Sequence, residues 1–222
     1  MLLRKLVLPL IFIICVSALW AGDTAVFVDL GFSPDGRTYM FGQHGVELPS
    51  LRPWAEARIV DVAGNVFVQN GRLESRPRTP IIAGQDGSGV LQQLLSNNTA
   101  LTSRHNINFN NQGLPLYISL DPNPPRTQRI EFRDFPTNRA FVATLNQSGS
   151  RFHIDLTSST AGGQRRTYPP IGTPIERPGT VQYSIKRVLI DSTGNSMIFV
   201  IEMKQTAANG HNIRYMVETI RL

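Results

Sequence analysis

Apolar and polar residues alternate along most of the chain beyond residue 23, and a period of two is the pattern of β-strands. Residues 26–31 alternate in this way, and residues 39–41 (Tyr-Met-Phe) begin a second, bulky strand. The Ser-Pro-Asp-Gly sequence of residues 33–36 lies between them, where proline fixes φ and glycine tolerates a positive φ. The pattern predicts a β-hairpin that organises the rest of the chain, with Phe32 or Phe41 buried.

Two further segments extend this hairpin. Residues 55–62 alternate again, residues 63–65 (Ala-Gly-Asn) have turn chemistry, and residues 66–68 form a short return. We therefore predict an antiparallel meander of about four strands over residues 24–70, which is a usual size for a sheet.

A glycine- and proline-rich break then precedes a change of period. Residues 71–89 read as a loop, and Ser88 is predicted to cap a helix. The apolar residues between 90 and 95 fall on one helical face. The sequence predicts one helix near residues 88–105, within a loop-and-helix segment of residues 71–106.

Strand patterns return after the helix and continue to the last residue. Strands are predicted at residues 116–120, 129–132, 140–146, 151–157, 181–191, 196–203 and 212–222. Residues 158–179, rich in Gly, Pro, Thr and Arg, are predicted to be a long exposed connection. The predicted fold is mainly β, with antiparallel meanders resembling propeller blades or a β-sandwich and one helix. We expect a single domain over residues 22–222, with its C-terminal strands in residues 115–222.

Two stretches of the chain are similar to each other. Residues 32–41 and residues 190–199 both contain a strand end, a turn with glycine and a bulky return strand. The similarity indicates either two related β-meander units or two hairpins that share only the chemistry of hairpins.

The first residues have the layout of a secretory signal peptide. Arg4 and Lys5 precede an apolar run, and Ala21 is a small residue suited to cleavage. An uncleaved membrane anchor is the alternative, but the apolar run is shorter than the ~20 residues of a spanning helix. A lipoprotein is disfavoured because Cys15 lies inside the apolar run. The layout predicts a secreted or periplasmic protein that meets the membrane only through residues 1–21.

Composition narrows the possible chemistry. Cys15 is the single cysteine, so a chain cleaved after Ala21 has no disulfide and no thiolate ligand. The formal charge of +6 falls to +4 without Arg4 and Lys5, and the remaining charge is spread along the chain. Nucleic-acid binding is not expected, because it favours a dense basic patch.

Candidate catalytic groups are sparse. The histidines at residues 44, 105, 153 and 211 have no metal-ligand spacing, so neither a metal nor another cofactor is expected. The acids that could act in pairs are Asp29 with Asp35 and Glu131 with Asp134. No catalytic residue is assigned. The alternative to a binding or structural protein is a hydrolase that acts on an envelope polymer through a carboxylate pair.

The late connection carries the candidate binding residues. Arg165, Arg166, Tyr168 and Arg177 place arginines beside an aromatic ring, a combination that suits anionic or planar partners. The expected partner is an envelope component, either protein or polysaccharide. A solvated loop without a ligand is the alternative. A deep pocket with two acids, or with an acid and a histidine, would favour the hydrolase, whereas a shallow arginine and aromatic surface would favour binding.

Six segments together carry a family resemblance. They are Ala-Gly-Asp at residues 21–23 and the segments at residues 31–45, 54–68, 83–89, 131–135 and 213–222. In this order they resemble a bacterial family of predicted secreted proteins of unknown function (domain of unknown function 2259). The resemblance implies export and supplies no catalytic residues. Residues 32–41 also resemble, locally, the WD40-like repeats of TolB-type periplasmic propellers, although a propeller needs several such repeats.

Overall fold

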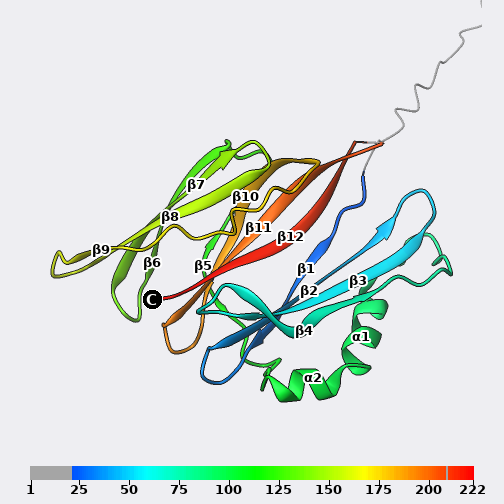
Figure 1. The fold of residues 1–222 in the computed structure, drawn as a ribbon, viewed down its shortest axis with the longest axis horizontal. Helices are drawn as coiled ribbons and strands as arrows, with labels where there is room; N and C mark the ends of the chain where they lie inside the picture. The colour runs from blue at the N-terminus through cyan, green and yellow to red at the C-terminus, as the bar shows by residue number, and fades with distance from the viewer. Residues whose placement is uncertain (1–21, 209) are drawn as a thin grey trace, which may run out of the picture.

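The computed structural model describes residues 22–208 and 210–222, so the predicted signal peptide, residues 1–21, lies outside the described residues. The described part contains twelve strands and two helices (Figure 1). They are β1 (Val26–Phe32), β2 (Thr38–Glu47), β3 (Arg52–Asp61), β4 (Val66–Ser75), α1 (Ser88–Ser96), α2 (Thr99–Arg104), β5 (Leu114–Ile118), β6 (Thr127–Asp134), β7 (Arg139–Ser148), β8 (Arg151–Thr160), β9 (Arg165–Thr167), β10 (Thr180–Ile190), β11 (Ser196–Ala207) and β12 (Gly210–Arg221). The prediction of a mainly β protein is confirmed. None of the described helices is long and apolar enough to cross a membrane.

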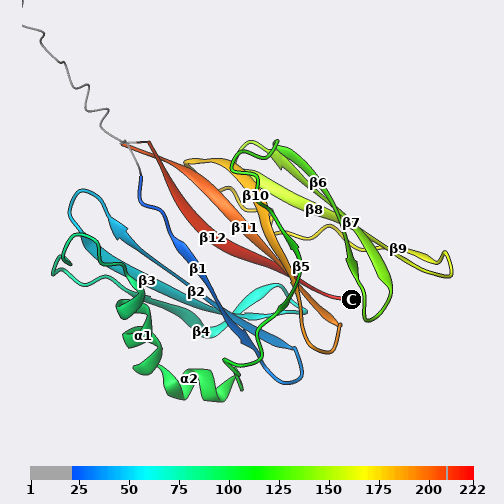
Figure 2. The same cartoon turned by 180° about the vertical axis from the view of Figure 1, so that it is seen from behind.

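The strands form three antiparallel sheets. The first sheet has the order β1-β2-β3-β4, the central sheet β12-β11-β10-β5, and the outer sheet β6-β7-β8-β9. The first sheet is the predicted meander, although β4 extends to Ser75, beyond the short return expected from the sequence. The three sheets lie in layers, as in a β-sandwich with one additional sheet (Figures 1 and 2).

Three hydrophobic clusters hold the layers together. Residues of the outer sheet, such as Phe141, pack against one face of the central sheet, where Phe199 lies. Residues of the first sheet, such as Phe41, pack against the opposite face of the central sheet, where Val200 lies. The far side of the first sheet packs on α1 through Leu91 and its neighbours. The central sheet is therefore apolar on both faces, which matches the continuous apolar run of residues 197–201 in β11.

The β1–β2 hairpin forms as predicted, and it contacts the similar hairpin between β10 and β11. Phe32 and Phe41 are both buried, and Gly36 has a φ of +66°. The Ser196 hydroxyl donates a hydrogen bond to the carbonyl of Gly36 at 2.7 Å. Asp191, in the second hairpin, lies against Gly36 so closely that a Cβ there would be 2.4 Å from Oδ2 of Asp191. The two similar stretches of sequence are thus neighbours in space.

The helical segment differs from its prediction in two ways. The single expected helix is divided at residues 97–98 into α1 and α2. Ser88 is not the N-cap, as predicted, but the first residue of α1, and Gly87 is the N-cap. The Ser88 hydroxyl instead donates to Asp86 Oδ1 at 2.6 Å, and the same carboxylate oxygen accepts the N–H of Ser88 at 3.0 Å. The Ser88 prediction is wrong because the helix begins one residue earlier than expected, and the Asp86 carboxylate rather than the Ser88 hydroxyl accepts an N–H of its first turn.

The expectation that residues 158–179 form a long exposed connection is also wrong in part. β8 continues through Thr160, and β9 adds a short edge strand to the outer sheet. Tyr168 and Ile171 are buried against the outer sheet, and Ile171 pairs with Ile154 through backbone hydrogen bonds of 2.7 and 2.9 Å. The segment then crosses to the edge of the central sheet.

Candidate functional site: a groove along β12

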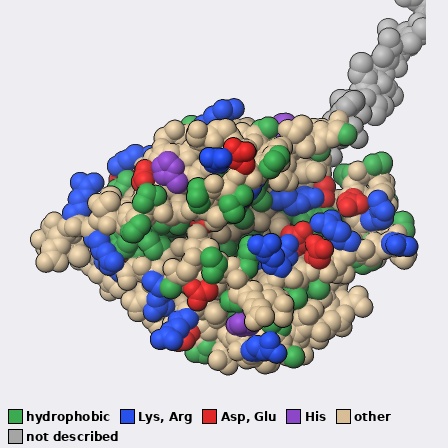
Figure 3. All heavy atoms as spheres, viewed as in Figure 1, with side chains coloured by type: hydrophobic (Ala, Val, Ile, Leu, Met, Phe, Trp, Pro, Cys, Tyr) green, Lys and Arg blue, Asp and Glu red, His purple; other side chains and the backbone are tan. Residues whose placement is uncertain are grey.

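A groove runs beside β12, the edge strand of the central sheet. It consists of two hollows, with volumes of about 870 and 550 Å³, which share Asn65, Val66 and Thr173 in their walls. The β3–β4 hairpin of the first sheet forms one wall, and the segment of residues 166–177 forms the other. Figure 3 shows hydrophobic and basic side chains around the hollowed middle of this face. We call the larger space the first hollow and the smaller one the second hollow.

An irregularity in β4 shapes the wall of the first hollow. Val60 pairs with Phe67 and Arg58 pairs with Arg72, so residues 68–71 bulge out of the register between these pairs. Asn70, within the bulge, has a positive φ of +59°. Bulges of this kind redirect side chains and are frequent near functional sites. Here the bulge lies between the Val60–Phe67 pair and the Arg58–Arg72 pair, and its own residues Val68, Asn70 and Gly71 line the hollow.

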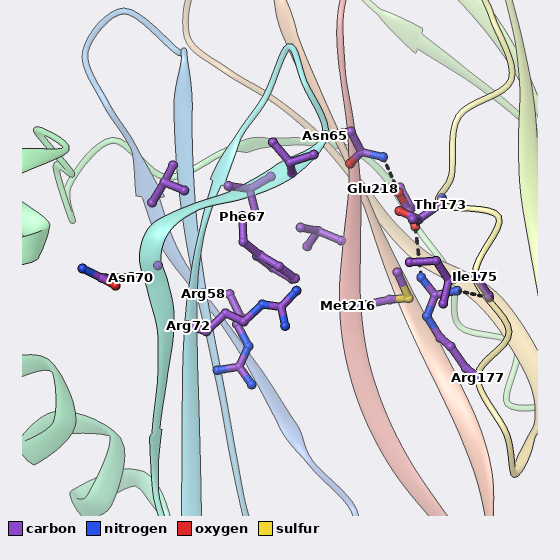
Figure 4. A pocket seen from close by; sticks show the side chains of 15 residues that line it. Arg58, Asn65, Phe67, Asn70, Arg72, Thr173, Ile175, Arg177, Met216 and Glu218 are labelled. Atoms are coloured by element: carbon purple, nitrogen blue, oxygen red, sulfur yellow. Dashed lines mark hydrogen bonds and ion pairs between the residues drawn. The ribbon is translucent and has the colours of Figure 1, made fainter.

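Apolar side chains line both walls of the first hollow (Figure 4). Val66 and Phe67 project from the β3–β4 hairpin and are 57% and 40% exposed. Ile175, on the opposite wall, is 57% exposed, and Met216 of β12 lies between the walls. Large apolar side chains with this exposure, gathered around one hollow, indicate a binding surface.

Three arginines line the same hollow, and each has a different environment. Arg58 is held by Glu56 at 3.0 Å and by the carbonyl of Leu73 at 2.6 Å, and its burial lowers the pKa of its guanidinium. Arg177 lies 3.8 Å from the carboxylate of Glu218. Arg72 is exposed and lies over the ring of Phe67, 4.5 Å from its centroid. Among the described residues Arg72 makes no ion pair, so its charge faces the hollow without a carboxylate.

Glu218 of β12, between the two walls, is hydrogen-bonded to both of them. Only 1% of its side chain is exposed, and it accepts hydrogen bonds from Asn65 Nδ2 and, at 3.3 Å, from the N–H of Thr173. Burial raises the pKa of the Glu218 carboxyl, although these hydrogen bonds and Arg177 act in the opposite direction. The side chain of Asn65 also accepts the N–H of Thr219 at 2.9 Å. These hydrogen bonds link the β3–β4 hairpin, β12 and the segment of residues 166–177 at the boundary between the two hollows.

The second hollow has its own pair of arginine and aromatic side chains. Arg166 lies over Tyr168, 4.5 Å from the ring centroid, and is exposed. The hydroxyl of Tyr168 lies 3.3 Å from that of Ser158. Arg221 lines the opposite side and donates to the Ser196 hydroxyl at 2.7 Å. Arg166, like Arg72, makes no ion pair within the described part of the chain.

The electrostatic character of the whole groove is basic. Five arginines line the two hollows, whereas Glu218 is the one carboxylate among the described lining residues. That carboxylate is buried and already hydrogen-bonded. The groove is therefore suited to a negatively charged ligand.

The outer edge of β12 is partly paired with groups from other segments. Its outward N–H groups at Ile213, Tyr215 and Thr219 are taken by the carbonyl of Asp23 at 2.9 Å, by Gln43 Oε1 at 2.8 Å and by Asn65 Oδ1 at 2.9 Å. These oxygen atoms replace the carbonyls of a neighbouring strand. A peptide strand that paired along the whole of β12 would therefore have to displace these three partners.

The structure brings three of the four predicted binding residues to this groove. Arg166 and Tyr168 line the second hollow and Arg177 lines the first. Arg165 instead lies on the outward face of the outer sheet and lines a separate hollow there, which Glu131 also lines. Tyr168 is 5% exposed, so its ring supports Arg166 more than it faces solvent.

The sequence alone did not predict Arg58, Phe67, Arg72 or Glu218 as site residues. Two signals were present: Arg72 follows an Asn-Gly pair in an otherwise strand-like segment, and Glu218 follows the apolar run of residues 215–217. Neither signal could show that the two residues lie on one groove.

The predicted acid pairs lie elsewhere. Asp29 accepts the N–H groups of Gly31 and Gly113, both at 3.0 Å, and Asp35 accepts the Ser33 hydroxyl within its turn. Glu131 is exposed whereas Asp134 is buried, because they lie on opposite faces of β6. Among the described residues no group of three or more His, Cys, Asp or Glu residues is arranged to hold a metal ion.

These observations define the protein as a layered, mainly β protein with a basic groove at the edge of its central sheet. The model of the family described as Predicted secreted protein (DUF2259) matches residues 40–221, so the chain belongs to this family. The match confirms the resemblance seen in the sequence, and the description agrees with export. No curated protein and no solved structure matches the chain.

Proposed function

We propose that the protein is a non-catalytic binding component of the bacterial cell envelope, which holds an anionic envelope component in the groove along β12. The observation that carries this proposal is the pair of exposed arginines, Arg72 and Arg166, each over an aromatic ring and each without an ion pair among the described residues. Guanidinium groups supported in this way present a planar set of donors to an oxyanion.

The composition of the groove supports binding over hydrolysis. A hydrolase of the expected type needs two carboxylates at a set separation. Of the described residues that line the two hollows, Glu218 is the single acid, and the lining contains no histidine. The hydrolase therefore remains the alternative, with less support from the groove than the binding protein has.

The test compares two variants that lose the same charge from different faces. The protein of residues 22–222, the Arg72→Ala/Arg166→Ala variant and the Arg129→Ala/Arg133→Ala variant are immobilised and exposed to envelope extract at low salt. Arg129 and Arg133 are exposed on the outward face of the outer sheet, so their loss leaves the groove intact. The retained material is released with high salt, which screens exposed charges, and its phosphate, carbohydrate and acyl content is measured.

We expect the groove variant to lose most of the retained anionic material and the matched variant to keep it. Equal retention by both variants would refute the groove as the binding site. Greater loss in the Arg129→Ala/Arg133→Ala variant would move the site to the outer sheet.

A further inference from the structure

The first hollow has an apolar part and a basic part, and they are adjacent. Val66 and Phe67 on one wall and Ile175 on the other expose hydrocarbon to the same space, above Met216 (Figure 4). A ligand with hydrocarbon of its own would remove these side chains from water, and this is the favourable term in burying apolar surface. A purely polar ligand would leave them exposed.

The basic part of the hollow begins directly at this apolar surface. The guanidinium of Arg72 covers the ring of Phe67, and Arg58 is its partner in the register of β3 and β4. Two like charges opposite each other on neighbouring strands repel one another. Glu56 and two carbonyls hold Arg58, but Arg72 has no such carboxylate within the described residues. An oxyanion bound at Arg72 would relieve this repulsion.

Other ligand classes fit this hollow less well. A peptide strand that extended along β12 beyond the hollow would have to displace Asp23, Gln43 and Asn65 from the N–H groups of that strand. A sugar polymer would place hydroxyl groups against Val66, Phe67 and Ile175, which offer no hydrogen bonds. A flat membrane surface would meet only the rim of a recess that has walls on both sides.

We propose that the first hollow binds a single-chain anionic amphiphile, that is, a hydrocarbon chain ending in a carboxylate or phosphate. The chain lies between Phe67 and Ile175, and the oxyanion is held by Arg72. This assignment rests on the proposed function and names the ligand class for the same groove. The volume of about 870 Å³ lies within the range of ~300–1,000 Å³ for small-molecule sites.

The test uses defined probes in calorimetric titration of the protein of residues 22–222. The probes are alkyl carboxylates and alkyl phosphates of eight to twelve carbons below their micelle concentrations, a neutral alkyl maltoside of equal chain length, and inorganic phosphate alone. We expect each added methylene to tighten binding about fourfold if it is fully buried. The neutral maltoside and free phosphate should bind at least roughly tenfold more weakly, because each lacks one half of the recognised chemistry.

Two single variants locate the head group. Arg72→Ala should weaken the binding of both anionic series roughly tenfold, the size expected for losing one charge-assisted hydrogen bond. Arg129→Ala removes the same charge from an exposed position on β6 and should leave binding unchanged. Both arginines are exposed, so both variants are expected to fold, and circular dichroism checks this. The series that binds more tightly shows whether the head group of the natural ligand is a carboxylate or a phosphate.

Three results would overturn the proposal: no dependence on chain length, equal binding of anionic and neutral amphiphiles, or equal loss in Arg72→Ala and Arg129→Ala. If these probes fail while the groove still retains envelope material in the extract experiment, the ligand class is wrong and the binding function stands. If both experiments fail, the binding function falls as well.

Discussion

Replacing Gly36 with alanine would test whether the contact between the two hairpins is rigid. Gly36 has a φ of +66°, and an added Cβ would lie 2.4 Å from Asp191 Oδ2. That carboxylate has little freedom to move, because it is buried and its other oxygen accepts the N–H groups of Asn195 and Ser196 at 2.8 and 2.7 Å. Gly149 is the matched control: its φ is +61°, but there is no atom within 4 Å of its added Cβ.

The two glycines separate backbone strain from steric conflict. An alanine at a left-handed position costs about 1–2 kcal/mol, and this cost applies to Gly36→Ala and Gly149→Ala alike. Inserting a methyl group into a packed contact adds roughly 1–3 kcal/mol, and this applies only to Gly36. We therefore expect Gly149→Ala to lower the free energy of unfolding by about 1–2 kcal/mol and Gly36→Ala by roughly 2–5 kcal/mol.

Urea denaturation with a fitted m-value gives both free energies of unfolding. If the two variants lose the same stability, to within about 0.5 kcal/mol, the contact between the hairpins is not rigid, and the Asp191 turn moves to make room for the methyl group. A large loss in Gly149→Ala alone would show that the backbone strain has been misjudged.

Three further outcomes are expected. Phe41→Ala should lower the free energy of unfolding by about 3–5 kcal/mol, because Phe41 is buried between two sheets. Arg166 is exposed, so Arg166→Ala should change this free energy little. A larger loss of stability in Arg166→Ala than in Phe41→Ala would contradict the prediction. Burial raises the pKa of Glu218 above its ordinary value of 4.5, so the folded state binds the extra proton and stability should fall as pH rises from about that value through the raised pKa. Asp23 and Asp29 also have raised pKa values, so Glu218→Gln should make this fall smaller rather than abolish it in urea titrations between pH 4 and 8, and parallel curves for the two proteins would contradict the assignment. Protein from the native host should lack roughly its first 21 residues by intact-mass analysis, and a full-length species in the membrane fraction would refute cleavage.

Strands could be predicted from the sequence wherever one face meets a core and the other meets solvent. β6 alternates strictly between exposed and buried residues, and residues 151–157 of β8 do the same. The last three strands were also located correctly, because their apolar runs are long and turns rich in polar residues and glycine separate them. Local chemistry likewise placed the turn at Gly36.

Contacts between distant segments could not be predicted from the sequence. The sequence placed Arg72, Arg177 and Glu218 on separate elements, and only the stacking of the sheets brings them to one groove. Tyr168 lies in a segment whose composition is that of an exposed loop, yet its ring packs on the outer sheet. Ser88 is not the cap, because the carboxylate of Asp86 accepts an N–H of the first turn in its place, and a preference based on residue type does not include such a neighbour.

The order of the layers has a consequence for how a chain of this kind becomes compact. The central sheet, which covers the inner faces of both other sheets, takes β10, β11 and β12 from the last part of the sequence. A chain that emerges with its N-terminus first therefore presents two apolar sheet faces before the layer between them exists. Such long-range pairing slows folding and leaves the early strands prone to association. An isolated bridge also joins Thr24 to Ile213 of β12, so contacts that complete the layers need nearly the whole chain.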